Sequence, residues 1–95
     1  MKLIDVRDST RKGKKLLARF QKKDGSVVSV HFGQAGSTTF SSGATEDKKN
    51  AYLKRHAPRE NWNNPVTAGA LSRWILWNKR SLKASIADFK KRFNL

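Results

Sequence analysis

The chain has 95 residues, of which 21 are Lys or Arg and only 7 are Asp or Glu, so its formal net charge is +14. It contains no cysteine, which excludes disulfides and cysteine–zinc sites. Its longest apolar run is too short to span a bilayer, and its first residues, MKLIDVRDST, lack the apolar core of a secretory signal. We therefore expect one soluble domain over residues 1–95 that is not secreted and that acts inside a cell or a particle.

Three segments near the N-terminus have the pattern of β-strands. A short one lies within residues 3–6, and residues 15–21 and 26–33 alternate apolar and polar side chains. The dipeptide Asp24-Gly25 between the last two favours a hairpin turn. The side chains that we expect on the core face of this sheet are Leu16, Ala18, Phe20, Val28, Val30 and Phe32.

The second half of the chain predicts helices. A loop rich in Gly, Ser and Thr (residues 33–44) leads to Thr45, a suitable N-cap for a helix that ends near His56, ahead of a proline. Thr67 is expected to cap a second helix that runs to about Trp77.

A third helix is expected to start after Ser81. Within it, Leu82, Ile86, Phe89 and Phe93 recur at helical spacing and form an apolar stripe. Lysine and arginine fill much of the remaining surface of this segment, which is typical of a helix that packs by one face only.

The order of these elements indicates the fold class. The strands fall within residues 1–33 and the helices within residues 45–95, with no internal repeat. Strands first and helices after are typical of an α+β fold. We expect a small antiparallel sheet of about three strands, covered by about three C-terminal helices.

The stretch TAGALSRWILW is the most apolar part of the second half, and it fits either a buried helix or an exposed aromatic surface. A sheet with one apolar face needs a cover, so we assign Leu71, Trp74 and Ile75 to the core. Leu76 and Trp77 point in other directions, where they either pack on the first helix or remain partly exposed. In the second case Trp77 is available for a stacking contact.

Several strings of residues resemble a known family. These are AYLKRH, ENW, NPVTAGALSRWILW and DFKKRFNL, together with HFGQAGSTTF in the first half. They are similar to a family of small basic proteins of unknown function, encoded by large DNA viruses of algae and other protists and by cyanophages. The resemblance covers roughly residues 14–95 and leaves DVRDSTRKGKK as the least family-like part. It implies a viral origin and a place in the virion or in the interior of an infected host cell, and it implies no catalytic residue.

Two segments carry nearly all of the surplus positive charge. Residues 7–23 hold eight Lys or Arg and one Asp, and residues 73–92 hold seven Lys or Arg and one Asp. Such a surplus favours a polyanionic partner, and one continuous track would follow a phosphate backbone. The alternative is two independent solvated faces. The candidate phosphate contacts are Arg11, Lys12, Lys14, Lys15, Arg19, Lys22, Lys23, Arg73, Lys79, Arg80, Lys83, Lys90, Lys91 and Arg92.

Two weaker patterns have structural explanations as well as functional ones. The run Gly33-Gln34-Ala35-Gly36 resembles a loop that clamps phosphates, but it follows a strand, which favours a plain turn with positive φ. Arg55 and His56, followed by Arg59, either contact phosphates or cap the end of the first helix.

Catalytic and metal chemistry have little support in the sequence. His31 and His56 lack cysteines or clustered carboxylates that would complete a metal site, and Glu46 and Asp47 fit the first turn of a helix. No nucleophile stands beside a base. We therefore expect no catalytic residue, no metal and no cofactor, although a small nuclease would be the enzymatic alternative.

These observations lead to two hypotheses of function. The first is a nucleic-acid-binding protein that contacts phosphates with little sequence specificity, DNA being more fitting than RNA, and that has no membrane partner. The second is a protein-interaction or virion structural module that binds an acidic viral or host surface. In that case Trp62, Trp77 and Arg80 are natural anchors, because Trp and Arg dominate binding hot spots.

Overall fold

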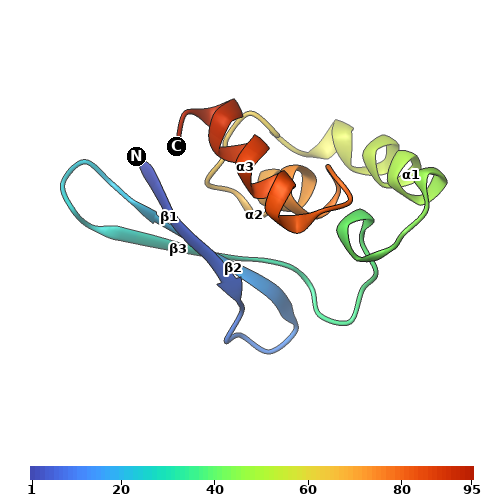
Figure 1. The fold of residues 1–95 in the computed structure, drawn as a ribbon, viewed down its shortest axis with the longest axis horizontal. Coiled ribbons are helices and arrows are strands. Elements are labelled where there is room, and N and C mark those ends of the chain that lie inside the picture. Colours follow the sequence, from blue (N-terminus) through green and yellow to red (C-terminus); the bar gives the residue numbers. More distant parts are fainter.

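The computed structural model describes residues 1–95 and shows a three-stranded sheet on which a layer of helices lies (Figure 1). The strands are β1 (Lys2–Asp8), β2 (Lys14–Gln21) and β3 (Val27–Gln34), and they pair antiparallel in the order β1-β2-β3. The predicted α+β class and all three strands are therefore confirmed.

The apolar face of the sheet forms as the alternation predicted. Leu16, Ala18, Phe20 and Phe32 are buried, and Val30 packs against them with partial exposure. Val28, also expected on this face, is half-buried and lies outside the core cluster. In the register of β2 and β3, paired residues point their side chains to the same face of the sheet. The apolar side chains of the two strands are therefore cross-strand neighbours. The core of the molecule therefore begins on this face.

The two hairpins have different details. At the β2–β3 turn, Gly25 has φ +89° and the hydroxyl of Ser26 donates to Asp24 Oδ1 at 2.6 Å, as the Asp-Gly pair predicted. In β1 the pairing register shifts between Leu3 and Asp5, so Ile4 is left 41% exposed. Such a bulge re-aims the strand and lets Leu3 reach the core, where it is buried.

The helical layer contains α1 (Glu46–His56), α2 (Ala68–Leu71) and α3 (Leu82–Phe93). Threonine and serine hydroxyls cap all three, as expected: Thr45 accepts from Lys48 N, Thr67 from Ala70 N, and Ser81 from Ala84 N. None of the helices is both long and apolar enough to cross a membrane.

The second helix differs from the regular helix that was expected. After α2 the chain continues as one turn of π-helix, η3 (Ser72–Leu76), in which Trp77 N donates to Ser72 O at 3.0 Å. The wider turn places residues five apart on one side, so Leu76 joins Leu71 and Ile75 in the core, each at most 2% exposed. A regular helix would aim Leu76 about 140° away from Leu71.

Helix α3 closes the core over the sheet. The ring of Phe89 meets that of Phe20 edge to face, with 6.5 Å between centroids, and Phe89 in turn lies 5.2 Å from Phe93. The predicted stripe is wrong at its first position, because Leu82 is 38% exposed. Ser85 is buried in its place, and its hydroxyl accepts a hydrogen bond from Lys79 N at 3.0 Å.

Helix α1 stands to one side of the sheet (Figure 1). Arginine and lysine contacts join this helix and the segment before it to the rest of the molecule. Two short 3-10 turns flank it, η1 (Phe40–Ser42) and η2 (Ala57–Arg59). The Arg80 guanidinium donates to the carbonyl oxygens of Phe40 and Ala44 and lies 3.9 Å from the centroid of the Phe40 ring. On the same ring, Lys49 Nζ lies 4.4 Å from the centroid and also donates to Asn78 O at 2.8 Å.

Candidate functional site

The first basic cluster is divided between the two ends of the sheet (Figure 1). Arg11, Lys12 and Lys14 lie at the β1–β2 turn, whereas Lys22 and Lys23 lie at the β2–β3 turn. The eight residues of β2 separate these turns by roughly 25 Å. The sheet alone therefore does not form the continuous track that was expected.

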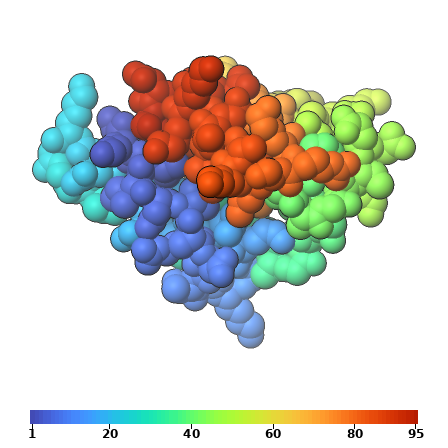
Figure 2. Space-filling view, viewed as in Figure 1, coloured from blue at the N-terminus to red at the C-terminus, as the bar shows by residue number.

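Helix α3 brings the second cluster to one of these ends. The contact between Phe89 and Phe20 places the C-terminal half of α3 over the end of β2, next to the β2–β3 turn. The two chain termini lie close together here (Figure 1), and Figure 2 shows β1 beside α3 on one face of the molecule. We call this region the basic end and define it by the exposed side chains of Lys2, Lys22, Lys23, Lys90 and Lys91.

Most basic side chains have no acidic partner. Of the 21 Lys and Arg side chains, only Arg7, Arg19 and Arg92 form an ion pair with a carboxylate. Several candidate contacts are exposed and have neither an ion pair nor a side-chain hydrogen bond. These are Arg11, Lys12, Lys14, Lys22, Lys23, Lys79, Lys83, Lys90 and Lys91.

Arg19, in contrast, is held on the face of the sheet that no helix covers. Its Nε and Nη2 donate to the two carboxylate oxygens of Asp5 at 2.8 and 2.6 Å, and Arg7 adds a contact of 2.9 Å. The hydrogen bond from Arg19 lowers the pKa of Asp5 to about 2, with the Arg7 hydrogen bond a smaller cause. His31 is half-buried on the same face, joined to Ser9 Oγ at 2.7 Å. Arg19 is thus largely neutralised.

Two further arginines sandwich Trp74. The Arg73 and Arg92 guanidinium carbons lie 4.1 and 3.8 Å from the centroid of its ring, and Arg73 also donates to Trp77 O at 3.0 Å. Burial, and secondarily the charge of Arg92, lower the pKa of Arg73. Trp62 is half-buried beside them and accepts a hydrogen bond of 2.9 Å from Trp74 Nε1 at its carbonyl oxygen. These arginines therefore stabilise the fold.

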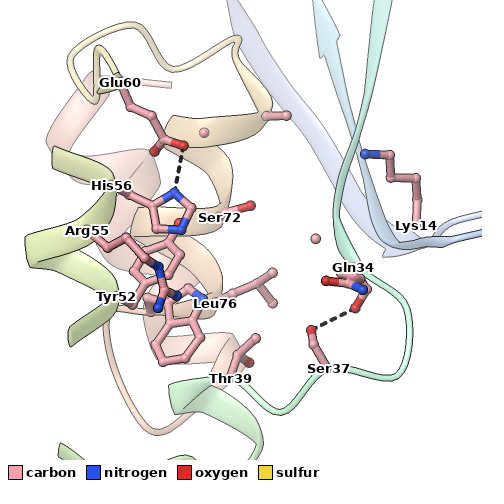
Figure 3. A pocket seen from close by; sticks show the side chains of 14 residues that line it. Lys14, Gln34, Ser37, Thr39, Tyr52, Arg55, His56, Glu60, Ser72 and Leu76 are labelled. Carbon is pink, nitrogen blue, oxygen red and sulfur yellow. Dashed lines mark hydrogen bonds and ion pairs between the residues drawn. The ribbon is translucent and has the colours of Figure 1, made fainter. Parts of the chain in front are cut away.

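A cleft of about 400 Å³ opens on the side of the molecule away from the basic end. It lies between the turn that follows β3 and the helices α1 and α2 (Figure 3). The polar and aromatic side chains in its walls are Lys14, Gln34, Ser37, Thr39, Tyr52, Arg55, His56, Glu60, Ser72 and Trp77.

One wall of the cleft is a stack of three rings. Tyr52 lies between His56 and Trp77, at 4.3 and 4.5 Å between centroids, so one of the two alternatives for Trp77, packing on the first helix, is the one observed. Burial raises the pKa of Tyr52 to about 12. Glu60 lies beside the stack: its carboxylate accepts from Trp62 Nε1 at 2.6 Å and faces His56 Nδ1 at 3.2 Å.

The opposite wall is the turn after β3. Gly33 and Gly36 both have φ +80°, which confirms the plain turn predicted from their spacing. A side chain at Gly33 would place its Cβ 2.8 Å from Leu76 Cδ1, so this residue also permits close packing. Lys15 Nζ ties the turn down by donating to Ser37 O at 2.7 Å. Lys15 is therefore used inside the molecule, whereas Lys14 remains free.

Sequence reasoning did not bring the cleft residues together. They come from β2, β3, α1, α2 and the segments between them, and no spacing in the chain signals that Gln34 and Ser72 face one cavity. Arg55 and His56 were considered as phosphate contacts or as helix caps. In the structure α1 ends with Ala57 N donating to Leu53 O, and both side chains line the cleft instead.

The fold and these surfaces define a small α+β protein with a strongly basic exterior and one polar cleft. The chain belongs to the Family of unknown function DUF5754, whose profile matches residues 4–56. This match includes residues 5–15, which the resemblance in sequence had left outside. A curated relative, "Uncharacterized protein L851" of Acanthamoeba polyphaga mimivirus, is 34% identical over 80 residues, which cover 78% of this chain and 80% of the relative. No solved structure matches.

Proposed function

We propose that this protein binds nucleic acid, DNA in preference to RNA, by contacting phosphates with little sequence specificity. The observation that carries the proposal is the basic end, where exposed lysines from β1, the β2–β3 turn and α3 lie at one end of the molecule and none of them forms an ion pair with a carboxylate. When these lysines neutralise phosphates, the cations condensed on the nucleic acid are released into solution, which favours binding at low salt. The viral relative is consistent with a viral setting.

The chemistry of the free side chains agrees with contact to a backbone rather than to bases. Most of the free side chains are lysines, whose ammonium group is a mobile point charge that suits any phosphate, whereas the planar groups of Arg, Asn and Gln are better suited to bidentate contacts with base edges. The preference for DNA comes from the resemblance to proteins of large DNA viruses. The proposal includes no catalytic step, no cofactor and no membrane contact.

The experiment that tests it reverses charge at the basic end. A variant with Lys22, Lys23, Lys90 and Lys91 all changed to Glu should bind a DNA duplex of about 20 base pairs at least about 100-fold more weakly at 50 mM salt, because several phosphate contacts are lost. Binding is measured by fluorescence anisotropy, and far-UV circular dichroism checks the fold. An RNA duplex of equal length measures the preference for DNA.

A control variant changes the net charge of a different region by nearly the same amount. Lys48, Lys54, Arg55 and Arg59 lie on α1 or just after it, are exposed, and stand away from the basic end. Changing Lys48, Lys54 and Arg59 to Glu, together with exposed Asn50→Asp, alters the net charge nearly as much. A loss of affinity as large as that at the basic end would show that only total charge matters.

The protein-interaction alternative loses its anchors in the structure. Trp62 and Trp77 are half-buried in intramolecular contacts, and Arg80 is bound to the carbonyls of Phe40 and Ala44. To bind a partner, these side chains would first have to break their intramolecular contacts, and that free-energy cost would weaken the binding. Nucleic-acid binding needs no such rearrangement and is the function that we favour.

A further inference from the structure

The cleft has an excess of positive charge that no internal acid uses. Lys14 and Arg55 line it from β2 and α1. The one carboxylate among the lining residues belongs to Glu60, and its two oxygens already face Trp62 Nε1 and His56 Nδ1. A group that enters the cleft therefore meets cations, and it meets no free carboxylate.

The donors in the cleft point to a ligand with several acceptor oxygens. Lys14 and Arg55 lie on opposite walls, and neither side chain has a hydrogen bond or an ion pair within the molecule (Figure 3). The hydroxyl of Ser72 and the side-chain amide of Gln34 also have no partner within the molecule.

The size of the cleft limits the ligand to something small. A volume of about 400 Å³ is within the range of small-molecule sites and too small for a duplex. A phosphomonoester carries a charge close to −2 near neutral pH and has three strong acceptor oxygens, which matches donors on two walls. A phosphodiester or a carboxylate offers only one negative charge.

We propose that this cleft binds a phosphomonoester, supplied either by the terminal phosphate of a nucleic-acid strand or by a free nucleotide. Arg55 and Lys14 hold the phosphate oxygens from opposite walls, and Ser72 donates a neutral hydrogen bond. Binding of a strand's terminal phosphate rests on the proposed function, because the strand itself must bind the protein. Binding of a free nucleotide does not depend on that function.

The first test locates the ligand. Adenosine monophosphate and adenosine are titrated separately into the ¹⁵N-labelled protein, and amide shifts are followed by NMR. We expect the monophosphate to shift the amides of Gln34, Ser37 and Ser72 and adenosine to leave them unchanged. Shifts confined to α3, or equal shifts with adenosine, would overturn the inference for the free nucleotide.

The second test compares strand ends. An oligonucleotide with a 5′-phosphate should bind about tenfold more tightly than the same oligonucleotide with a 5′-hydroxyl, which corresponds to one charge-assisted hydrogen bond. Arg55→Gln should remove this difference and leave the affinity for the 5′-hydroxyl strand unchanged. Arg59→Gln is the matched control, because Arg59 is exposed, lies four residues away and does not line the cleft.

The outcomes separate the two proposals. If neither oligonucleotide binds but the monophosphate shifts the cleft amides, the proposed function fails and the cleft inference holds for free nucleotides. If both strands bind equally and the monophosphate causes no shift, the cleft inference fails while the proposed function stands. If Arg55→Gln and Arg59→Gln reduce the preference for the 5′-phosphate strand equally, that preference depends only on total charge. This result would also overturn a site in the cleft.

Discussion

The basic end and the region around Phe40 and Trp74 use the same kind of residue in opposite ways. At the basic end the lysines of β1, the β2–β3 turn and α3 stand in water without partners. Around Phe40 and Trp74, cations lie over aromatic rings and donate to backbone carbonyls. The first region is available to a ligand, and the second holds α1, η3 and α3 together.

The difference follows the chemistry of the two side chains. Arg73, Arg80 and Arg92 are flat, carry several donors and stack on rings, so the fold uses them internally. Most lysines remain solvated, because an ammonium is costly to desolvate. The exceptions agree with this: Lys49 is partly buried, and that burial is the main cause that lowers its pKa, followed by the charge of Arg73. A count of charges therefore overstates the surface that is free to bind.

Among the substitutions that test this comparison, the largest loss of stability is expected at Arg80. Arg80→Ala removes the hydrogen bonds to Phe40 and Ala44 and the contact with the Phe40 ring, and should lower the free energy of unfolding by about 2 kcal/mol. Its neighbour Lys79 is exposed and its side chain is free, so Lys79→Ala should cost less than about 0.5 kcal/mol. Urea unfolding measures both, and equal costs would contradict the distinction.

A second effect is expected at Tyr52, the one tyrosine of the chain. Burial raises its pKa to about 12, whereas an unfolded tyrosine titrates near 10. The neutral phenol is favoured in the folded state, so this contribution to stability is complete below about pH 10 and is lost as the pH rises towards 12. Absorbance of the phenolate reports this residue alone, and a midpoint near 10 in protein that circular dichroism shows to be folded would contradict the packed stack.

The smallest effect is expected at Asp5, on the exposed face of the sheet. Its pKa is lowered to about 2, first by the hydrogen bond from Arg19, so its contribution to stability is present above about pH 4 and is lost as the pH falls to about 2. Asp5→Asn should therefore lower the melting temperature slightly at pH 6, with the gap to the natural protein closing by pH 2. A gap that persists at pH 2 would mean that another interaction is responsible.

Local patterns predicted most of the fold. The alternation in residues 15–21 and 26–33, the Asp24-Gly25 turn and the caps at Thr45 and Ser81 depend on neighbours in the chain, and each formed as expected. The π-turn at Ser72–Leu76 did not follow from local propensity, because it arises where Leu71, Ile75 and Leu76 must all reach one core. The exposure of Leu82 likewise depends on the position of the helix rather than on its periodicity.

The candidate site was less predictable than the fold. Spacing alone does not tell that Arg73 and Arg92 meet across Trp74, or that Lys22 and Lys90 lie at the same end of the molecule, because both depend on how α3 crosses the sheet. The cleft depends on even more distant segments, with Lys14 and Arg55 on opposite walls. Composition indicated a polyanionic partner, and only tertiary packing could show which cations are free to meet it.

The most direct test of the account is the salt dependence of DNA binding by the natural sequence. If the free lysines contact phosphates, a plot of log K against log salt concentration between 50 and 200 mM should be linear, with a slope near −0.9 for each phosphate contacted and hence about −4 for the four lysines of the β2–β3 turn and α3. No binding at 50 mM salt, or a slope close to zero, would contradict the central claim that these side chains form a surface for nucleic acid.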